Sequence, residues 1–128
     1  MERIAVFPGS FDPFTVGHEE IVRRALKLFD KIIIAVGINP GKREFLSTES
    51  RIKLIQKAFE DTDRVSVEPY SGLTVDFCQQ VNSHIIIRGL RTAADFEYER
   101  AIGQANRAMD GAIETVFILT STVHTFVS

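Results

Sequence analysis

The sequence predicts an α/β fold: a doubly wound, five-stranded parallel sheet with helices on both faces. Apolar segments that favour strands alternate along the chain with segments whose apolar residues recur at helical spacing. Two strand segments, 31–38 and 84–88, contain an Ile-Ile-Ile run without polar alternation, which is typical of central parallel strands buried on both faces. Polar and basic side chains follow the strands, at the edge where such sheets bind ligands.

The chain opens with a strand, a loop and a helix. Residues 4–7 form a short apolar strand, and Gly9, Pro13 and Gly17 exclude regular structure from the loop that follows. We expect the first helix at 19–29, because apolar residues recur there at helical spacing. These residues are Ile21, Val22, Ala25, Leu26, Leu28 and Phe29.

The second strand, at 31–38, ends in a loop of turn-forming and basic residues at 39–43. Ser47 or Thr48 then supplies a side-chain oxygen that can cap the next helix. The apolar residues of that helix at helical spacing are Ile52, Leu54, Ile55, Ala58 and Phe59.

The second half of the chain continues the alternation. The expected strands are 65–70, 84–88 and 115–119, and the expected helices are 73–81 and 95–109. The inward side of the helix at 73–81 is expected to hold Val75, Phe77, Cys78 and Val81. Strand–helix alternation throughout the chain favours parallel strands joined by helical crossovers.

The loop before the first helix is the first candidate site. Its backbone N–H groups meet a helix N-terminus, where unpaired donors and the helix dipole favour an anion such as phosphate. Ser10 adds a hydroxyl group, and His18 lies in the first turn of the helix. The alternative is that Gly9 and Gly17 only serve the turn and that the histidine is a surface residue.

Basic and hydroxyl side chains follow the other strands. Lys42 follows the second strand and Thr74 the third, while Arg88 and Arg91 follow the fourth. The fork of an arginine side chain suits phosphate, and Gly89 would allow the backbone to approach a ligand closely. A solvated lysine is the alternative at position 42. The arginines could instead be neutralised by acidic residues of the next helix, which are Asp95, Glu97 and Glu99.

Three other residues have structural interpretations. Asp12 precedes a proline, so a turn role would explain it, and Phe11 belongs either to the core or beside a nucleotide base. Cys78 is expected to be a small core residue, because no candidate base accompanies it.

Length and composition describe one ordinary globular domain. The 128 residues are 45% hydrophobic and 25% charged, and no apolar run is long enough to span a membrane. The net charge of −2 makes a nonspecific nucleic-acid partner unexpected. The single cysteine excludes an internal disulfide and fits a reducing cytoplasm.

Residues 9–18 read Gly-Ser-Phe-Asp-Pro-Phe-Thr-Val-Gly-His. This string resembles the G-[ST]-F-D-P-x-T-x-G-H signature of bacterial phosphopantetheine adenylyltransferases, in the nucleotidylyltransferase superfamily. Residues 87–91, Ile-Arg-Gly-Leu-Arg, with the Ala-Asp-Phe-Glu-Tyr-Glu that follows, resemble the second signature of the family. The resemblance covers all 128 residues.

The resemblance implies a Rossmann-like nucleotidylyltransferase fold and the reaction of ATP with 4′-phosphopantetheine to give dephospho-coenzyme A and pyrophosphate. It also implies Mg²⁺ carried by the ATP phosphates, a homohexamer in the cytoplasm and coenzyme A as a further ligand. Neither a nucleic acid nor a membrane is an expected partner.

Site residues also follow from the resemblance. His18, Lys42 and Arg91 would be catalytic. ATP would contact Ser10, Phe11, His18, Gly89, Leu90, Arg91, Glu99, His124, Thr125, Phe126, Val127 and Ser128. Phosphopantetheine would contact Ser10, Lys42, Thr74 and Arg88. No protein ligand to a metal is implied.

Two features depart from the family. Position 124 is His where the family often has a bulky aromatic residue, and the sequence ends at Ser128 where the family continues with an ATP-binding tail. We therefore expect residues 1–128 to be a single domain without that tail. If this is the whole polypeptide, ATP binding should be weakened; the alternative is that the sequence is a fragment of a longer protein. Two alternatives remain: a superfamily member with a different acceptor, and a module that binds nucleotide or coenzyme A without turnover.

Overall fold

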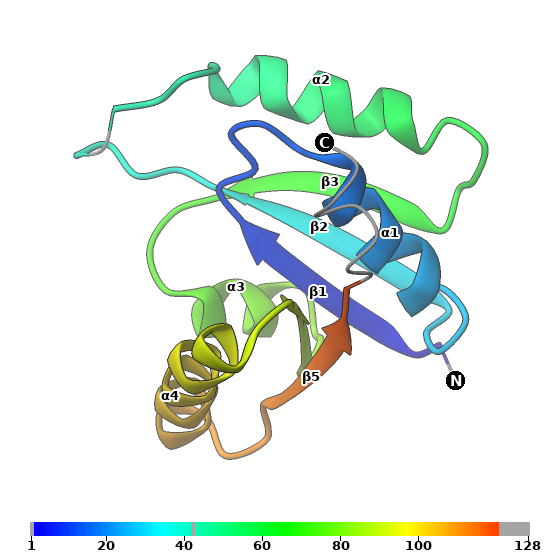
Figure 1. Cartoon of the computed structure of the whole chain (residues 1–128). Coiled ribbons are helices and arrows are strands. Elements are labelled where there is room, and N and C mark those ends of the chain that lie inside the picture. The colour runs from blue at the N-terminus through cyan, green and yellow to red at the C-terminus, as the bar shows by residue number, and fades with distance from the viewer. Residues whose placement is uncertain (1, 42, 121–128) are drawn as a thin grey trace.

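The computed structural model describes residues 2–41 and 43–120, which form a five-stranded parallel sheet between two layers of helices (Figure 1). The strands run in the order β3-β2-β1-β4-β5. Their bounds are β1 Ile4–Gly9, β2 Lys31–Gly37, β3 Val65–Tyr70, β4 Ile85–Leu90 and β5 Glu114–Leu119. The predicted doubly wound α/β fold is confirmed.

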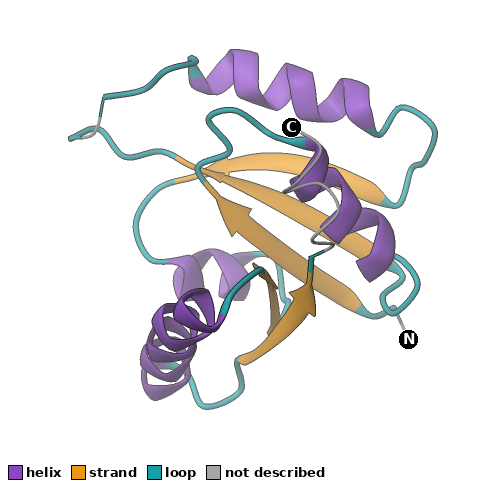
Figure 2. Ribbon diagram, viewed as in Figure 1, coloured by secondary structure: helices purple, strands orange, loops and turns teal. Residues whose placement is uncertain are grey.

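Four helices connect the strands within the described ranges. They are α1 Val16–Ala25, α2 Thr48–Ala58, α3 Thr74–Gln80 and α4 Ala93–Met109. Helices α1 and α2 cover one face of the sheet, and α3 and α4 cover the other (Figures 1 and 2). No helix in this part of the chain is both long enough and apolar enough to cross a lipid bilayer.

The core lies in two clusters, one on each face of the sheet. Alternate residues of β1 point to opposite faces, so Phe7 packs with Val22 and Ile55 under α1 and α2, while Val6 packs with Cys78 beside α3. Strand β2 is buried along nearly its whole length, as its unbroken apolar run predicts. Each fully buried aliphatic side chain contributes about 1.5–3 kcal/mol by leaving water.

Three local predictions are wrong. Helix α1 begins at Val16 and ends at Ala25, whereas 19–29 was expected, because Thr15 caps the helix before the apolar spacing begins. Leu28 lies in the turn after α1, and Leu54 lies on the outer side of α2. Both leucine side chains are about half exposed rather than buried.

Cys78 is a core residue, as predicted. Its side chain is buried in the cluster beside α3, and burial raises the pKa of its thiol to about 11. A thiol with that pKa stays protonated at neutral pH and is a poor nucleophile.

The direction of winding reverses between β1 and β4, which are neighbours although two strands separate them in sequence. These strands are paired only at Val6 and Ile86, whereas β1 and β2 are paired over six positions. Such a switch point is where ligands bind in doubly wound sheets.

Candidate active site

A cleft lies over this switch point and consists of two adjoining hollows of about 520 and 1020 Å³. We call them the first and second hollow. The first extends over the ends of β2 and β3 toward α4, and the second extends over the N-terminus of α1. Five residues line both hollows and so lie where the two meet: Pro8, Gly9, Ser10, Arg88 and Glu99.

His18 is held by the N-terminus of its own helix. The hydroxyl of Thr15 accepts a hydrogen bond from the His18 backbone N–H at 3.3 Å, and the Thr15 backbone N–H donates to His18 Nδ1 at 2.9 Å. Because a backbone N–H can only donate, Nδ1 must be the unprotonated ring nitrogen. Nε2 then carries the proton of the neutral ring and is available as a donor to the second hollow, which His18 lines.

The surroundings of His18 favour this neutral form. Burial lowers the pKa of the imidazole, and the positive charges of Arg88 and Arg91 lower it further. At neutral pH the site therefore presents an N–H donor from His18 and separate positive charges from the arginines.

Arg88 is fixed on the floor of the cleft by two partners. Its Nε and one terminal nitrogen donate to the carboxylate of Glu99 at 2.8 and 2.9 Å, and the other terminal nitrogen donates to the carbonyl of Pro8 at 2.8 Å. The charge of Arg88 is therefore neutralised by an acidic residue of the next helix, which was the alternative considered from the sequence. A guanidinium has five N–H groups, so two stay available for an anion in the cleft.

Arg91 lies at the rim of the second hollow, and its guanidinium is 3.6 Å from Asp95. Its side chain is largely exposed, so this ion pair is weak and the arginine can turn toward a bound anion. The side chain of Leu90, by contrast, is buried in the sheet, and its carbonyl accepts from the Thr120 backbone N–H at 2.8 Å. The structure does not place Leu90 among the residues that line either hollow.

Gly89 has a packing role that the sequence did not indicate. A Cβ atom at this position would lie 2.3 Å from Cδ1 of Ile21, so the absence of a side chain allows α1 to lie close against β4. Gly89 also lines the second hollow, where its backbone faces the cleft.

Phe11 belongs to the core and also lines the second hollow. Its ring is buried and makes edge contacts with Phe7, Phe14 and His18. It also fills the space above Gly9, where an added Cβ would approach the ring to 2.8 Å.

Thr74 lines the first hollow, and its hydroxyl is 2.9 Å from the hydroxyl of Tyr70. The structure thus brings Ser10, Thr74, Arg88 and Glu99 to one hollow, with His18 and Arg91 in the next. Lys42 and the predicted ATP contacts His124, Thr125, Phe126, Val127 and Ser128 lie outside the described residues.

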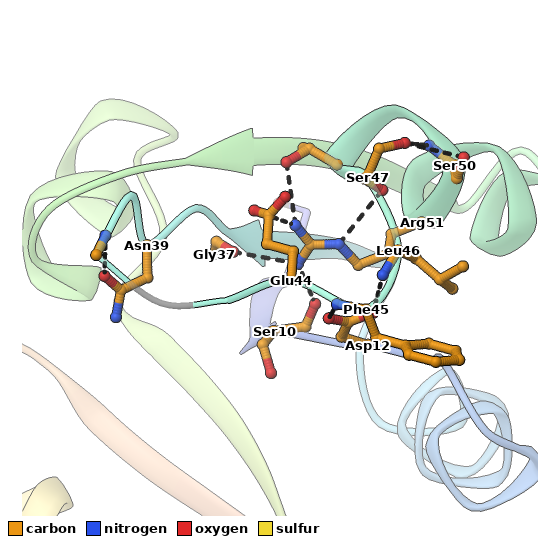
Figure 3. A network of polar contacts seen from close by, with 12 residues as sticks. Ser10, Asp12, Gly37, Asn39, Glu44, Phe45, Leu46, Ser47, Ser50 and Arg51 are labelled. Atoms are coloured by element: carbon orange, nitrogen blue, oxygen red, sulfur yellow. Dashed lines mark hydrogen bonds and ion pairs between the residues drawn. The ribbon is translucent and has the colours of Figure 1, made fainter.

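Sequence reasoning missed Arg51 and underestimated Asp12. The side chain of Arg51 is only 2% exposed, and it donates to Ser10 and Gly37 from the first turns of α2 (Figure 3). Asp12 accepts hydrogen bonds from the N–H groups of Phe45 and Leu46 instead of serving only its own turn. The available signal for Arg51 was its position four residues before Ile55, on the buried side of an amphipathic helix.

The donor set of the cleft does not form a metal cage. Among the residues that the structure describes, no group of three or more His, Cys, Asp or Glu side chains is placed to hold a metal ion. Histidine and arginine donors suit phosphate oxygens, so a divalent cation would be held mainly by the phosphates of a nucleotide.

A doubly wound sheet with a helix N-terminus, a neutral histidine and two arginines at its switch point defines a phosphate-binding α/β protein. Residues 6–128 match the family model described as cytidylyltransferase-like. Among solved structures, a bifunctional NMN adenylyltransferase/ADP ribose pyrophosphatase from Francisella tularensis, complexed with AMP and a manganese ion, aligns with a TM-score of 0.68 at 21% identity. That alignment covers 94% of this chain and 38% of the other.

A lipopolysaccharide core biosynthesis protein from Thermoplasma volcanium aligns over 94% of this chain and 98% of its own, with a TM-score of 0.63 and 20% identity. At these identities the structural neighbours bear on the fold alone.

Sequence relatives are much closer. A phosphopantetheine adenylyltransferase from Flavobacterium johnsoniae is 49% identical over 98% of this chain and 82% of its own length. One from Leptospira biflexa is 48% identical over 100% of this chain and 80% of its own, and one from Cytophaga hutchinsonii is 51% identical over 94% and 81%. The chain belongs to the phosphopantetheine adenylyltransferase family, as its two signatures predict.

Proposed function

We propose that this protein transfers the adenylyl group of ATP to 4′-phosphopantetheine, giving dephospho-coenzyme A and pyrophosphate. The observation that carries this proposal is the meeting of two hollows at Ser10 and Arg88. Two substrates that each end in phosphate need adjoining sites whose phosphates meet at a shared group of donors. The names of the sequence relatives supply the identity of the acceptor.

The reaction needs alignment and charge stabilisation more than proton transfer. An oxygen of the 4′-phosphate attacks the α-phosphorus of ATP, and a new P–O bond forms. The bond from that phosphorus to the oxygen bridging to the β-phosphate breaks, and pyrophosphate leaves with the electron pair. The attacking oxygen is already anionic at neutral pH, so a strong general base is unnecessary.

The residues of the cleft match these needs. The Nε2–H of His18 would donate to an oxygen of the α-phosphate as negative charge accumulates there. Arg88, held by Glu99 and Pro8, would direct its free N–H groups to the acceptor phosphate from the floor that both hollows share. Arg91 would reach the triphosphate from the rim of the second hollow.

Lys42, Thr74 and Ser10 complete the proposed phosphopantetheine site. Thr74 and Ser10 line the first hollow, and Lys42 follows Gly41 in the sequence. Phe11, Gly89, Leu90 and Glu99 would act on the ATP side mainly through packing and backbone shape.

A divalent cation on the triphosphate would neutralise part of its charge, and we propose Mg²⁺ for this role. Residues His124, Thr125, Phe126, Val127 and Ser128 would contribute further ATP contacts. A cytoplasmic location, assembly as a homohexamer and binding of coenzyme A are parts of the proposal that rest on the family resemblance.

The direct test is release of pyrophosphate by this chain with MgATP and 4′-phosphopantetheine, with dephospho-coenzyme A identified by mass spectrometry. In His18→Ala we expect kcat to fall about 100–1,000-fold with KM values changed less than about 3-fold, because the lost hydrogen bond strengthens in the transition state. His84→Ala is the matched control, since His84 is exposed and lies at the amino end of β4, whereas the cleft lies at the carboxyl ends of the strands.

Three outcomes would contradict the proposal. Faster turnover with another phosphate or alcohol acceptor would assign the chain to a different reaction of the superfamily. Thermal stabilisation by ATP or coenzyme A without pyrophosphate release would indicate a binding module. Equal losses in His18→Ala and His84→Ala would remove His18 from the chemistry.

A further inference from the structure

We propose that Arg51, which never lines the cleft, is the positioning residue for the wall of the first hollow. This wall consists of Ser10 and residues 37–40, from the ends of β1 and β2. The inference deepens the proposed function, because the wall faces the site proposed for the acceptor substrate. It rests on hydrogen bonds and burial around a guanidinium that no part of the mechanism above uses.

The guanidinium of Arg51 donates along its whole perimeter (Figure 3). One terminal nitrogen donates to the carbonyls of Ser10 at 2.6 Å and Gly37 at 3.4 Å. The other donates to Glu44 Oε1 at 2.8 Å and Thr48 Oγ1 at 3.0 Å, and Nε donates to the Ser47 carbonyl at 3.4 Å. All five N–H groups of the side chain thus have acceptors.

These acceptors belong to three segments of the chain, two of them outside α2 and the residues just before it. Ser10 lies 41 residues from Arg51 and Gly37 lies 14 residues away, and both belong to the wall. The three other acceptors belong to the start of α2 and the segment before it. Arg51 therefore fixes the ends of β1 and β2 relative to α2.

A second tie joins the same segments beside Arg51. The carboxylate of Asp12, two residues after Ser10, accepts from the N–H groups of Phe45 at 2.6 Å and Leu46 at 2.7 Å. The residues from Glu44 to Ser47 are thereby held to the β1–α1 loop. The chain is therefore fixed at Gly37 and again from Glu44 onward.

Only arginine can supply these contacts. The planar fork presents five donors in fixed directions, whereas a lysine ammonium has three donors at one point. The side chain is almost fully buried, and its one ionic partner, Glu44, lies at the surface. Burying a charge this deeply is costly unless its hydrogen bonds are all satisfied, so the arrangement is rigid.

The test compares Arg51→Lys with the unchanged chain in steady-state kinetics. We expect KM for 4′-phosphopantetheine to rise about 10-fold or more, because displacement of the wall misplaces the acceptor. KM for ATP should rise by a smaller factor, since residues 37–40 do not line the second hollow and Ser10 lines both hollows. Glu44→Gln, which removes only the charge of one acceptor, should move the same KM in the same direction by a smaller factor.

Arg64→Lys is the matched control. Arg64 also donates from its guanidinium to backbone carbonyls, those of Leu26, Phe29 and Asp30, at the opposite edge of the sheet. It should lower the melting temperature without a change in either KM.

A second measurement does not depend on the reaction. Amide hydrogen exchange without substrates should speed up at residues 37–39, 41, 45 and 46 in Arg51→Lys and in Glu44→Gln, well below the melting temperature. It should stay unchanged there in Arg64→Lys. If the unchanged chain makes no dephospho-coenzyme A, the proposed function fails and this exchange pattern alone decides the role of Arg51. Unchanged exchange at these residues in both variants would overturn the inference. So would equal rises in both KM values, or a loss of stability with both KM values unchanged.

Discussion

The two sides of the cleft hold their principal side chains by different means. On the α1 side, His18 is oriented by Thr15, only three residues earlier, through the N-terminal cap of the helix. On the β4 side, Arg88 is oriented by Glu99, eleven residues later on α4, and by Pro8, which is 80 residues earlier on β1. His18 is therefore oriented by contacts within its own helix start, whereas Arg88 is oriented by residues that only the folded sheet and α4 bring together.

This difference separates the two kinds of support. The cap that orients His18 forms whenever α1 forms, and it also satisfies backbone donors that every helix start leaves open. The support of Arg88 exists only when β1, β4 and α4 are all in place, so it depends on the whole fold. Substitutions on the β4 side should therefore have larger effects on ligand binding than substitutions of the cap.

The largest effect on ligand binding is expected from Arg88→Met, which removes the side chain that β1, β4 and α4 hold together. Loss of charge-assisted hydrogen bonds worth about 1.5–3 kcal/mol corresponds to roughly a 10- to 150-fold rise in the Kd of 4′-phosphopantetheine. Titration calorimetry on the variant and the unchanged chain measures this directly. The substitution also leaves Glu99 without its partner, so the melting temperature should fall.

Arg107→Met is the matched control for this experiment. Arg107 is also paired with a glutamate, Glu114 at 3.8 Å, but both side chains are exposed and lie away from the cleft. Its Kd for 4′-phosphopantetheine should equal that of the unchanged chain. An unchanged Kd in Arg88→Met would show that the ion pair with Glu99 is purely structural.

An intermediate effect is expected from Thr15→Val, which weakens the local side. The substitution removes the hydroxyl that accepts from the His18 backbone N–H but keeps the Thr15 N–H that donates to Nδ1. Unfolding by urea should show a loss of about 1 kcal/mol, the usual cost of a helix cap, and kcat should fall only a few-fold.

Thr62→Val gives the comparison, because the Thr62 hydroxyl likewise accepts from a backbone N–H, that of Arg64 at 3.1 Å. It should lower stability by a similar amount and leave kcat unchanged. A loss of kcat in Thr15→Val as large as that in His18→Ala would mean that the hydroxyl itself takes part in the reaction.

The same contrast explains how much the sequence could predict. The order of strands and helices, the buried run of β2 and the placement of His18 in a first turn depend on spacing and turn residues, and all were predicted. The start of α1 was misplaced because its apolar spacing begins after its cap, although Thr15 with His18 three residues later was visible. The start of α1 can therefore be predicted from the sequence when the capping residues are considered together with the apolar spacing.

Long-range partners were harder to predict. The choice of Glu99 among three acidic candidates for Arg88 depends on how α4 lies on the sheet. The need for glycine at position 89 comes from Ile21, which is far away in sequence. Arg51 was missed because most of its acceptors are backbone carbonyls. Every residue has a backbone carbonyl, so the sequence does not indicate which ones accept a hydrogen bond.

The smallest effect concerns pH and tests whether the folded protein favours the neutral form of His18. Burial and the nearby arginines lower the pKa of His18 in the folded protein, so below its ordinary value of 6.5 the unfolded chain binds the proton more readily. The free energy of unfolding should therefore decrease as the pH falls from 6.5 toward the lower folded pKa, and this contribution should be fully present above pH 6.5.

Urea titrations at several pH values on the unchanged chain and on His18→Gln isolate the effect, because every other titrating group is common to both. The stability of the unchanged chain should fall more steeply with acid than that of the variant, since protonation of Nδ1 also removes the acceptor for the Thr15 N–H. Parallel curves would contradict the lowered pKa, and a steeper fall in the variant would mean that the folded site prefers the charged imidazolium.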